Sequence, residues 1–145
     1  MSATFSAQLL GQTEKAANAI LERLLAEPGL TEPQWVILSI TVMSGGTLDR
    51  QRLIERAAAA AKFSEAQAQA RISELADAQL LHVPDDELTP VKLTDVGQQL
   101  HTEIRAATSQ ITRRLWGDLP VEDLEAAGRV LSTVLARANA ELACG

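Results

Sequence analysis

The middle of the chain, residues 62–93, reads KFSEAQAQARISELADAQLLHVPDDELTPVKL. Ser64 and Gln67 form a capping box, in which the serine oxygen accepts from a backbone amide and the glutamine reaches back to the start of the helix. Phe63 stands where an apolar residue packs against the first turn of such a helix. The apolar residues that follow recur at helical spacing, so the segment opens with an amphipathic helix: Ala68, Ile72, Leu75 and Ala76.

Two short apolar segments follow this helix. Leu80-Leu81-His82-Val83 predicts a strand, and Val91-Lys92-Leu93 predicts a returning strand after a polar turn bracketed by Pro84 and Pro90. Another helix is predicted to begin near Asp49. Two helices joined by a tight linker and followed by a β-hairpin make a winged helix-turn-helix.

The boundary between these two helices has two interpretations. Neither glycine nor proline separates them, so one continuous helix from Asp49 to Leu81 is an alternative. The cap at Ser64 and the apolar residue before it favour a break at residues 62–64. Lys62 also suits the negative carboxyl end of a preceding helix.

The segment before this lobe predicts two further helices. Residues 6–26 have leucines and isoleucines at helical spacing, and Pro28-Gly29 ends that pattern. Thr31 and Gln34 form a second capping box, with Pro33 tolerated in the first turn. Residues 35–43 are apolar on nearly all sides, which is typical of a central helix. A buried strand is the competing interpretation of their β-branched residues.

Two long helices are predicted after the hairpin. Apolar residues recur every three or four positions over 94–115, and Leu124, Leu131 and Ala138 recur every seven over 121–142. Helices at both ends of a short chain leave apolar faces uncovered, which favours a homodimer over an intrachain helical core alone. The predicted fold is mostly α: a winged-helix lobe at about residues 31–93, with dimerisation helices at about 6–26 and 94–142.

Composition excludes several classes of protein. With 145 residues, 46% of them hydrophobic and 22% charged, the chain fits one ordinary globular domain. Its apolar runs are shorter than the roughly 20 residues of a membrane span, and residues 1–5 do not resemble a secretory signal. Cytoplasmic residence without membrane association is therefore expected.

Enzymatic and metal chemistry have no motif in the sequence. His82 and His101 stand alone, and Cys144 is the only cysteine, which favours an incidental thiol over a bridge between two tails. Neither a phosphate-binding loop nor a nucleophile–base pair is recognisable. We therefore expect neither an enzyme nor a bound cofactor, with no catalytic or metal-ligating residues.

Three segments together resemble the MarR family of transcription regulators. Leu30-Thr31-Glu32-Pro33-Gln34-Trp35 resembles the opening of the family's second helix. Residues 72–81, ISELADAQLL, resemble the end of its recognition helix, and Leu93-Thr94-Asp95-Val96-Gly97 resembles the passage from wing to dimerisation helix. The resemblance covers almost the full length of the chain, and we predict a single domain of this family over residues 1–145. It implies a homodimeric regulator, a repressor in our interpretation, that reads a pseudo-palindromic operator in double-stranded DNA and is often released by a small, commonly phenolic, ligand.

Candidate DNA contacts follow from that resemblance and from side-chain chemistry. Gln67 and Arg71 are predicted to lie on the outward face of the recognition helix, with Gln69 on its flank; glutamine suits adenine and arginine suits guanine. An ion pair with Glu74 is the alternative role for Arg71. The candidate phosphate contacts are basic side chains and a hydroxyl at a helix start: Arg50, Arg52, Lys62, Ser64 and Lys92. Ligand-binding residues are not identified; Trp35 and Trp116 suit either a pocket or the core.

The charge distribution departs from the family pattern. The family usually has arginine in the wing, whereas this turn reads PDDELTP over residues 84–90. Residues 47–94 contain six basic and eight acidic residues, a net charge of −2, within a chain of net charge −6. Carboxylates near phosphates repel them. A winged-helix dimer that has lost DNA binding and binds a protein or a ligand is therefore the alternative function.

Overall fold

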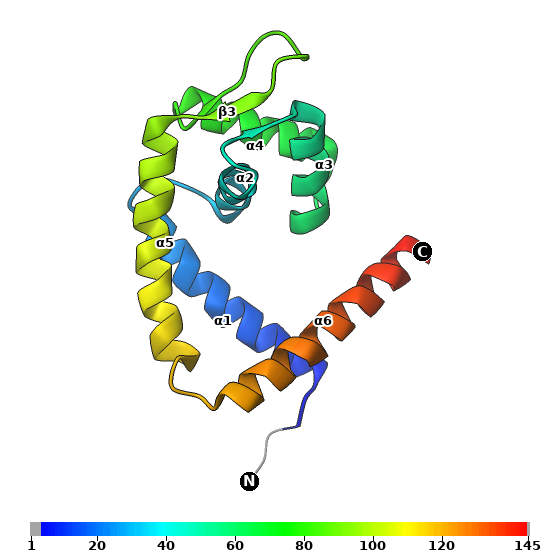
Figure 1. Cartoon of the computed structure of the whole chain (residues 1–145). Helices are drawn as coiled ribbons and strands as arrows, with labels where there is room; N and C mark the ends of the chain where they lie inside the picture. Colours follow the sequence, from blue (N-terminus) through cyan, green and yellow to red (C-terminus); the bar gives the residue numbers. More distant parts are fainter. Residues whose placement is uncertain (1–3, 145) are drawn as a thin grey trace. The chain divides into compact units, whose positions relative to one another are not determined.

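The computed structural model describes residues 4–144, in which six helices and three short strands are present. One compact unit ends at Thr108 and a second begins at Ser109, so one helix runs from the first unit into the second (Figure 1). The elements are, in chain order, α1 (Ala7–Ala26), α2 (Glu32–Met43), β1 (Thr47–Leu48), α3 (Arg50–Ala61), α4 (Glu65–Asp77), β2 (Leu81–His82), β3 (Val91–Leu93), α5 (Asp95–Trp116) and α6 (Val121–Cys144).

Capping residues set the starts of α2 and α4, as the sequence predicts. The Gln34 backbone N–H donates to Thr31 Oγ1, and the Thr31 N–H donates to Gln34 Oε1. Ser64 and Gln67 form the same reciprocal pair at α4. Residues 35–43 are therefore helical, and the strand interpretation is wrong. A satisfied cap stabilises a helix by about 1 kcal/mol.

Helices α3 and α4 are separate. Lys62 adopts a left-handed conformation with φ of 58°, and the Phe63 N–H donates to the Ala58 carbonyl at 3.3 Å. A left-handed residue ends an α-helix by turning the chain away from its axis. The alternative of one continuous helix from Asp49 to Leu81 is wrong.

A three-stranded antiparallel sheet in the order β1-β3-β2 forms the wing. Strand β3 pairs with β2 through Leu81↔Leu93 and His82↔Lys92, which confirms the predicted hairpin. It also pairs with β1, a two-residue strand that the sequence analysis did not predict. Thr94 Oγ1 donates to the carbonyls of Gln79 and Leu80 at 2.7 and 3.0 Å, which ties the start of α5 to the hairpin.

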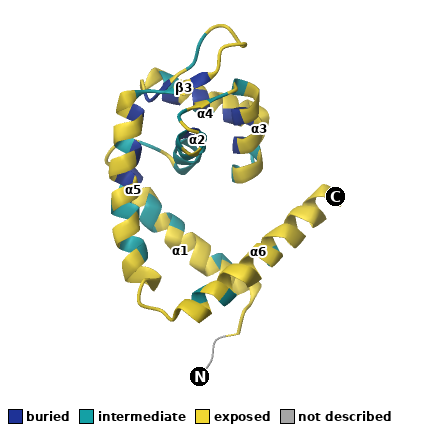
Figure 2. Cartoon of the chain, viewed as in Figure 1, coloured by how far each residue is buried: buried dark blue, intermediate teal, exposed yellow. Residues whose placement is uncertain are grey.

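The core of the first unit surrounds α2 (Figure 2). Ile37 and Leu38 of α2 are fully buried among apolar residues of α3, α4 and the sheet. Trp35 also packs against this core, and its ring stacks on the buried His101 of α5, with centroids 4.6 Å apart and an interplanar angle of 14°. Trp35 is therefore a core residue, and α2 is the central helix that its sequence predicts.

The second unit differs from the first in the burial of its apolar side chains. Helix α6 has no buried residue in the described part of the chain, although its apolar residues recur at helical spacing. Leu135 and Leu142 are 59% and 67% exposed. The apolar pattern that predicted helix-on-helix packing is present on α6, and its leucines are exposed in the described part of the second unit.

Candidate nucleic-acid interface

Helix α4 has one face in the core and the other exposed. Its buried residues are Ala68, Ile72 and Leu75, which pack against α2, α3 and the sheet. With 3.6 residues per turn, the side chains that point away from this face are those of Ala66, Ala70, Ser73 and Asp77, and all four are exposed. The helix therefore presents a small, uncharged surface along its first two turns.

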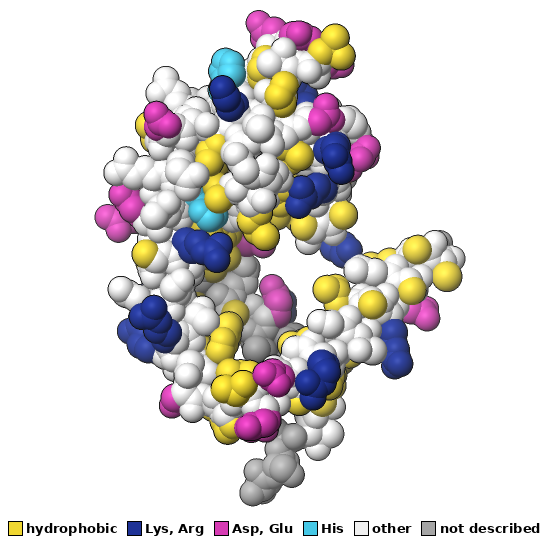
Figure 3. Space-filling model, in the orientation of Figure 1, with side chains coloured by type: hydrophobic (Ala, Val, Ile, Leu, Met, Phe, Trp, Pro, Cys, Tyr) yellow, Lys and Arg dark blue, Asp and Glu magenta, His cyan; other side chains and the backbone are white. Residues whose placement is uncertain are grey.

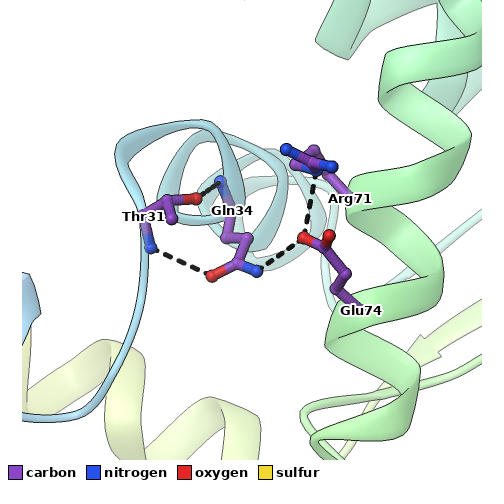
Figure 4. Close-up of polar contacts among 4 residues, drawn as sticks. All are labelled: Thr31, Gln34, Arg71 and Glu74. Carbon is purple, nitrogen blue, oxygen red and sulfur yellow. Dashed lines mark hydrogen bonds and ion pairs between the residues drawn. The ribbon is translucent and has the colours of Figure 1, made fainter.

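Arg71 lies on the flank of α4 that faces α2, not on the outward face predicted from the sequence. Its Nε is 3.0 Å from Glu74 Oε1, and its side chain is 35% exposed. Gln34 Nε2 donates to the same Glu74 oxygen at 2.8 Å, and the Gln34 amide oxygen caps Thr31 (Figure 4). These four residues join α4 to the start of α2. The ion pair with Glu74, the alternative considered from the sequence, is present.

The residues at the start of α4 are exposed, and some of their hydrogen-bonding groups are already used in the helix cap. The Ser64 hydroxyl accepts from the Gln67 N–H at 3.1 Å, and the Gln67 amide oxygen accepts from the Ser64 N–H at 2.9 Å. Gln69 is exposed on the opposite flank and lines a hollow of about 240 Å³. That hollow lies between α4, the start of α3 and the wing, where Arg50 and Glu87 also line it.

The basic residues predicted to contact phosphates differ in their exposure to solvent. Arg52, Lys62 and Lys92 are exposed, on α3, on the α3–α4 turn and on β3. Arg50 is half-buried, and its guanidinium donates to the carbonyl oxygen of Pro84 at the base of the wing. Its Nε is buried without a hydrogen-bond partner in the described chain. Arg50 therefore braces the wing against α3.

The turn between β2 and β3 is acidic and exposed. Figure 3 shows acidic and hydrophobic side chains together at the tip of this turn. Asp86 accepts from the Leu88 N–H at 2.9 Å and from Thr89 Oγ1 at 3.1 Å, which fixes the turn and leaves Leu88 91% exposed. Asp85 and Glu87 add two further carboxylates, and this surface would repel a phosphate backbone.

A separate cavity of about 390 Å³ lies between the end of α1 and the middle of α5. It is lined by aliphatic side chains and Pro28 together with two carboxylates, Glu27 and Glu103. Nearby, burial raises the pKa of Glu32, with the carboxylates of Glu14 and Glu22 adding to the effect. Carboxylates of α1 and α2 therefore lie close enough to interact, in the same unit as the cavity.

Sequence reasoning missed the contacts that hold α4 and the wing in place. Gln34 and Glu74 are 40 positions apart, and Arg50 and Pro84 are 34 apart, so no local pattern links them. Within residues 4–144 no cluster of His, Cys, Asp or Glu is arranged to hold a metal ion. Over the same residues, no helix has the length and apolar character needed to cross a membrane.

Comparison with known proteins gives matches in structure. No protein-family model matches the sequence, and no curated protein matches it. A MarR family transcriptional regulator from Silicibacter pomeroyi DSS superposes with a TM-score of 0.75 at 21% identity, covering 93% of this chain and 90% of that chain. NadR in complex with 4-hydroxyphenylacetate gives a TM-score of 0.73 at 22% identity, covering 93% and 98%.

A third structure contains nucleic acid. The Mycobacterium tuberculosis MarR family protein Rv2887, in complex with DNA, gives a TM-score of 0.69 at 20% identity, covering 91% of this chain and 98% of that chain. The similarity extends over nearly the whole length of each protein, including the helix-turn-helix, the wing and the long helices. The chain therefore has the winged-helix fold of the MarR-family transcriptional regulators.

Proposed function

We propose that the chain is a homodimeric, sequence-specific regulator that binds double-stranded DNA through α4 and acts as a repressor. The observation that carries this proposal is the exposed outer face of α4, a capped helix held rigidly in a helix-turn-helix. The major groove of DNA admits one α-helix, and the first turns of a recognition helix contact base edges. Exposed Arg52, Lys62 and Lys92, with the Ser64 hydroxyl, supply phosphate contacts.

Dimerisation follows from the uncovered face of α6. Leu131 and Leu135 lie one turn apart, and both are more than 40% exposed in the single chain. A second copy would cover this face through the same residues on its own α6, since closed dimers are isologous. Two α4 helices would then reach successive major grooves, about one helical turn apart on a pseudo-palindromic operator.

The test is selection from a pool of random duplex DNA at low salt, followed by binding measurements on the enriched sequence. We expect a two-fold symmetric sequence whose affinity falls steeply with salt. Ala70→Asp puts a carboxylate on the outer face of α4 and should abolish binding, whereas Ala106→Asp, at an alanine of α5 that is also exposed, should not. If the pool shows no enrichment over its starting composition, the proposal is contradicted.

A small effector would act through the cavity between α1 and α5. Structural neighbours were solved with 4-hydroxyphenylacetate and with salicylic acid, which both carry a carboxyl group. Glu27 and Glu103 line the cavity of this chain, and like charges repel at close range. We therefore expect a neutral or cationic aromatic effector here.

Two phenols of similar size test the charge of the effector. Tyramine should raise the Tm and release bound DNA, whereas 4-hydroxyphenylacetate should do neither. In the Glu27→Gln variant, the two compounds should differ less in their effects on the Tm and on DNA release. Release by the carboxylate alone would contradict the assignment of this cavity.

The acidic wing supports a second candidate function. Asp85, Asp86 and Glu87 directly precede the exposed Leu88, and such an acidic surface suits a basic protein partner better than a phosphate backbone. In that case the winged-helix dimer would bind a protein and not DNA. Failure of the DNA selection, with recovery of a partner that is lost in a triple Asn/Gln variant of these acids, would favour it.

A further inference from the structure

We infer that the half-site read by α4 is rich in A·T base pairs, with Gln69 as the adenine reader and Ala66 and Ala70 against thymine methyl groups. This inference rests on the proposed function and assigns the class of operator that the same surface takes. Three features of α4 carry it: its outward side chains, the contacts of its arginine and the contacts of its two glutamines.

The outward side chains of the first two turns are methyl groups. Ala66 and Ala70 are exposed and lie one turn apart on the face opposite the buried Ala68 and Ile72. An alanine offers neither donor nor acceptor to a guanine or a cytosine. In the major groove it can pack on the C5-methyl of thymine, which is the one apolar group on a base edge.

The side chain that would read guanine is held elsewhere. Arg71 is the only basic residue of α4, and its Nε lies 3.0 Å from Glu74 Oε1. Gln34 donates to that same carboxylate at 2.8 Å and is itself fixed by the cap at Thr31. A bidentate contact to guanine requires the guanidinium to turn outward and leave Glu74. Arg71 therefore acts as a positioning residue, because it pairs with the Glu74 carboxylate that accepts from Gln34 of α2.

The two glutamines are not equivalent. The Gln67 amide oxygen accepts from the Ser64 N–H at 2.9 Å, so this side chain folds back on the helix start. A bidentate contact to adenine uses both the oxygen and the nitrogen of the amide. No such cap holds Gln69 within residues 4–144, and this residue is exposed on the flank of α4 that borders the hollow beside the wing. Gln69 is therefore the residue that reads adenine.

The experiment is selection by the full chain from random duplex DNA, repeated with variants. Wild type should enrich half-sites dominated by A·T pairs. Gln69→Ala should lower affinity for the enriched duplex by about 5- to 150-fold and remove the adenine preference at one position of each half-site. Gln12→Ala, an exposed glutamine of α1, is the matched control and should leave both unchanged.

The Arg71→Gln variant separates positioning from reading. It should enrich the same sequence as wild type, with any loss of affinity spread evenly over all positions. Half-sites rich in guanine whose guanines disappear with Arg71→Gln would overturn the inference. If the Arg71→Gln variant unfolds, the inference is still tested by the base composition of the half-sites that wild type and Gln69→Ala select. Enrichment of no sequence at all would contradict the proposed function itself, and the inference with it.

Discussion

The two units of the chain contain similar apolar patterns and bury them very differently. Leu53 of α3 is fully buried, whereas Leu135 of α6 is 59% exposed, although both lie on helices with apolar residues at regular spacing. Every fully buried apolar side chain that the structure describes belongs to the unit that ends at Thr108. The comparison shows that periodicity identifies an apolar face without identifying what covers it.

The difference has a physical consequence for stability. The first unit gains its hydrophobic free energy from contacts within one chain, at about 25 cal/mol per Å² of apolar surface buried. The second unit gains such free energy when another surface covers the exposed apolar face of α6. Its stability should therefore depend on protein concentration, as in obligate homodimers.

The largest expected effect comes from charge on the α6 face. The double variant Leu131→Asp/Leu135→Asp places four carboxylates in a two-fold interface that would otherwise bury four leucines, each contributing about 1.5–3 kcal/mol. Sedimentation velocity should show a monomer at concentrations where wild type is a dimer, with dimer affinity reduced at least about 100-fold. DNA binding should be lost with it.

Thr133→Asp is the control for this variant, because Thr133 is exposed on the opposite side of α6. It should remain dimeric and bind DNA. A dimeric double variant would show that the α6 face is not the interface.

The next largest effect is on the free energy of unfolding. Replacing a glycine by alanine should lower it in the first unit and raise it in the second. A Cβ at Gly97 would lie 2.2 Å from the Leu80 carbonyl oxygen, so the contact between α5 and the wing must shift. Overpacking of this kind costs about 1–3 kcal/mol. In the single chain a Cβ at Gly128 of α6 meets nothing within 4 Å, but Gly128 lies one turn before Leu131 on the proposed interface. In the monomeric Leu131→Asp/Leu135→Asp background, Gly128→Ala should therefore stabilise by up to about 1 kcal/mol through helix propensity.

Urea unfolding of Gly97→Ala and Gly128→Ala measures both effects. Equal losses of stability in the two variants would contradict the difference in packing between the units.

A smaller effect on stability is expected from the Thr31 cap at the start of α2. This cap fixes Gln34, which donates to Glu74 of α4. Thr31→Ala removes the acceptor for the Gln34 N–H and should lower the free energy of unfolding by about 1 kcal/mol. Thr31→Ser keeps the hydroxyl and should restore most of that stability. If Thr31→Ser were as unstable as Thr31→Ala, the loss would reflect packing of the methyl group instead of the cap.

The smallest effect is a pH dependence within the first unit. Burial, reinforced by the Arg105 guanidinium, lowers the pKa of His101, which also lies 3.2 Å from Ser39 Oγ. The unfolded chain then binds a proton at a higher pH than the folded chain, so stability should fall as the pH drops below about 6.5. His101→Gln should weaken this dependence in urea unfolding at pH 7.5 and 5.5. An unchanged slope would exclude His101 as its source.

Local features of the sequence predicted most of the fold. The capping boxes at Thr31 and Ser64 act over three residues, and both helix starts are where the sequence places them. The hairpin and the break at Lys62 are local as well. Strand β1 could not be predicted because two residues are too few to show an alternation of apolar and polar side chains. Its partner strand β3 also lies far along the chain.

The candidate site was less predictable because its side chains are positioned by distant partners. The sequence placed Arg71 on the outward face, whereas it lies on a flank of α4 and pairs with Glu74, which accepts from Gln34 of α2. The guanidinium of Arg50 donates to the carbonyl of Pro84, 34 positions away, which no local pattern predicts. The DNA contacts of Gln67, Gln69, Arg71, Arg50 and the other phosphate-facing residues remain predictions.

In the proposed assembly, α6 pairs two chains so that two α4 helices bind one duplex. Native mass spectrometry of the full chain with its selected duplex measures the numbers of chains and duplexes in the complex. We expect a complex of two chains on one duplex, which the Leu131→Asp/Leu135→Asp variant fails to form. A complex of one chain with one duplex, or dimers that carry no DNA, would contradict it.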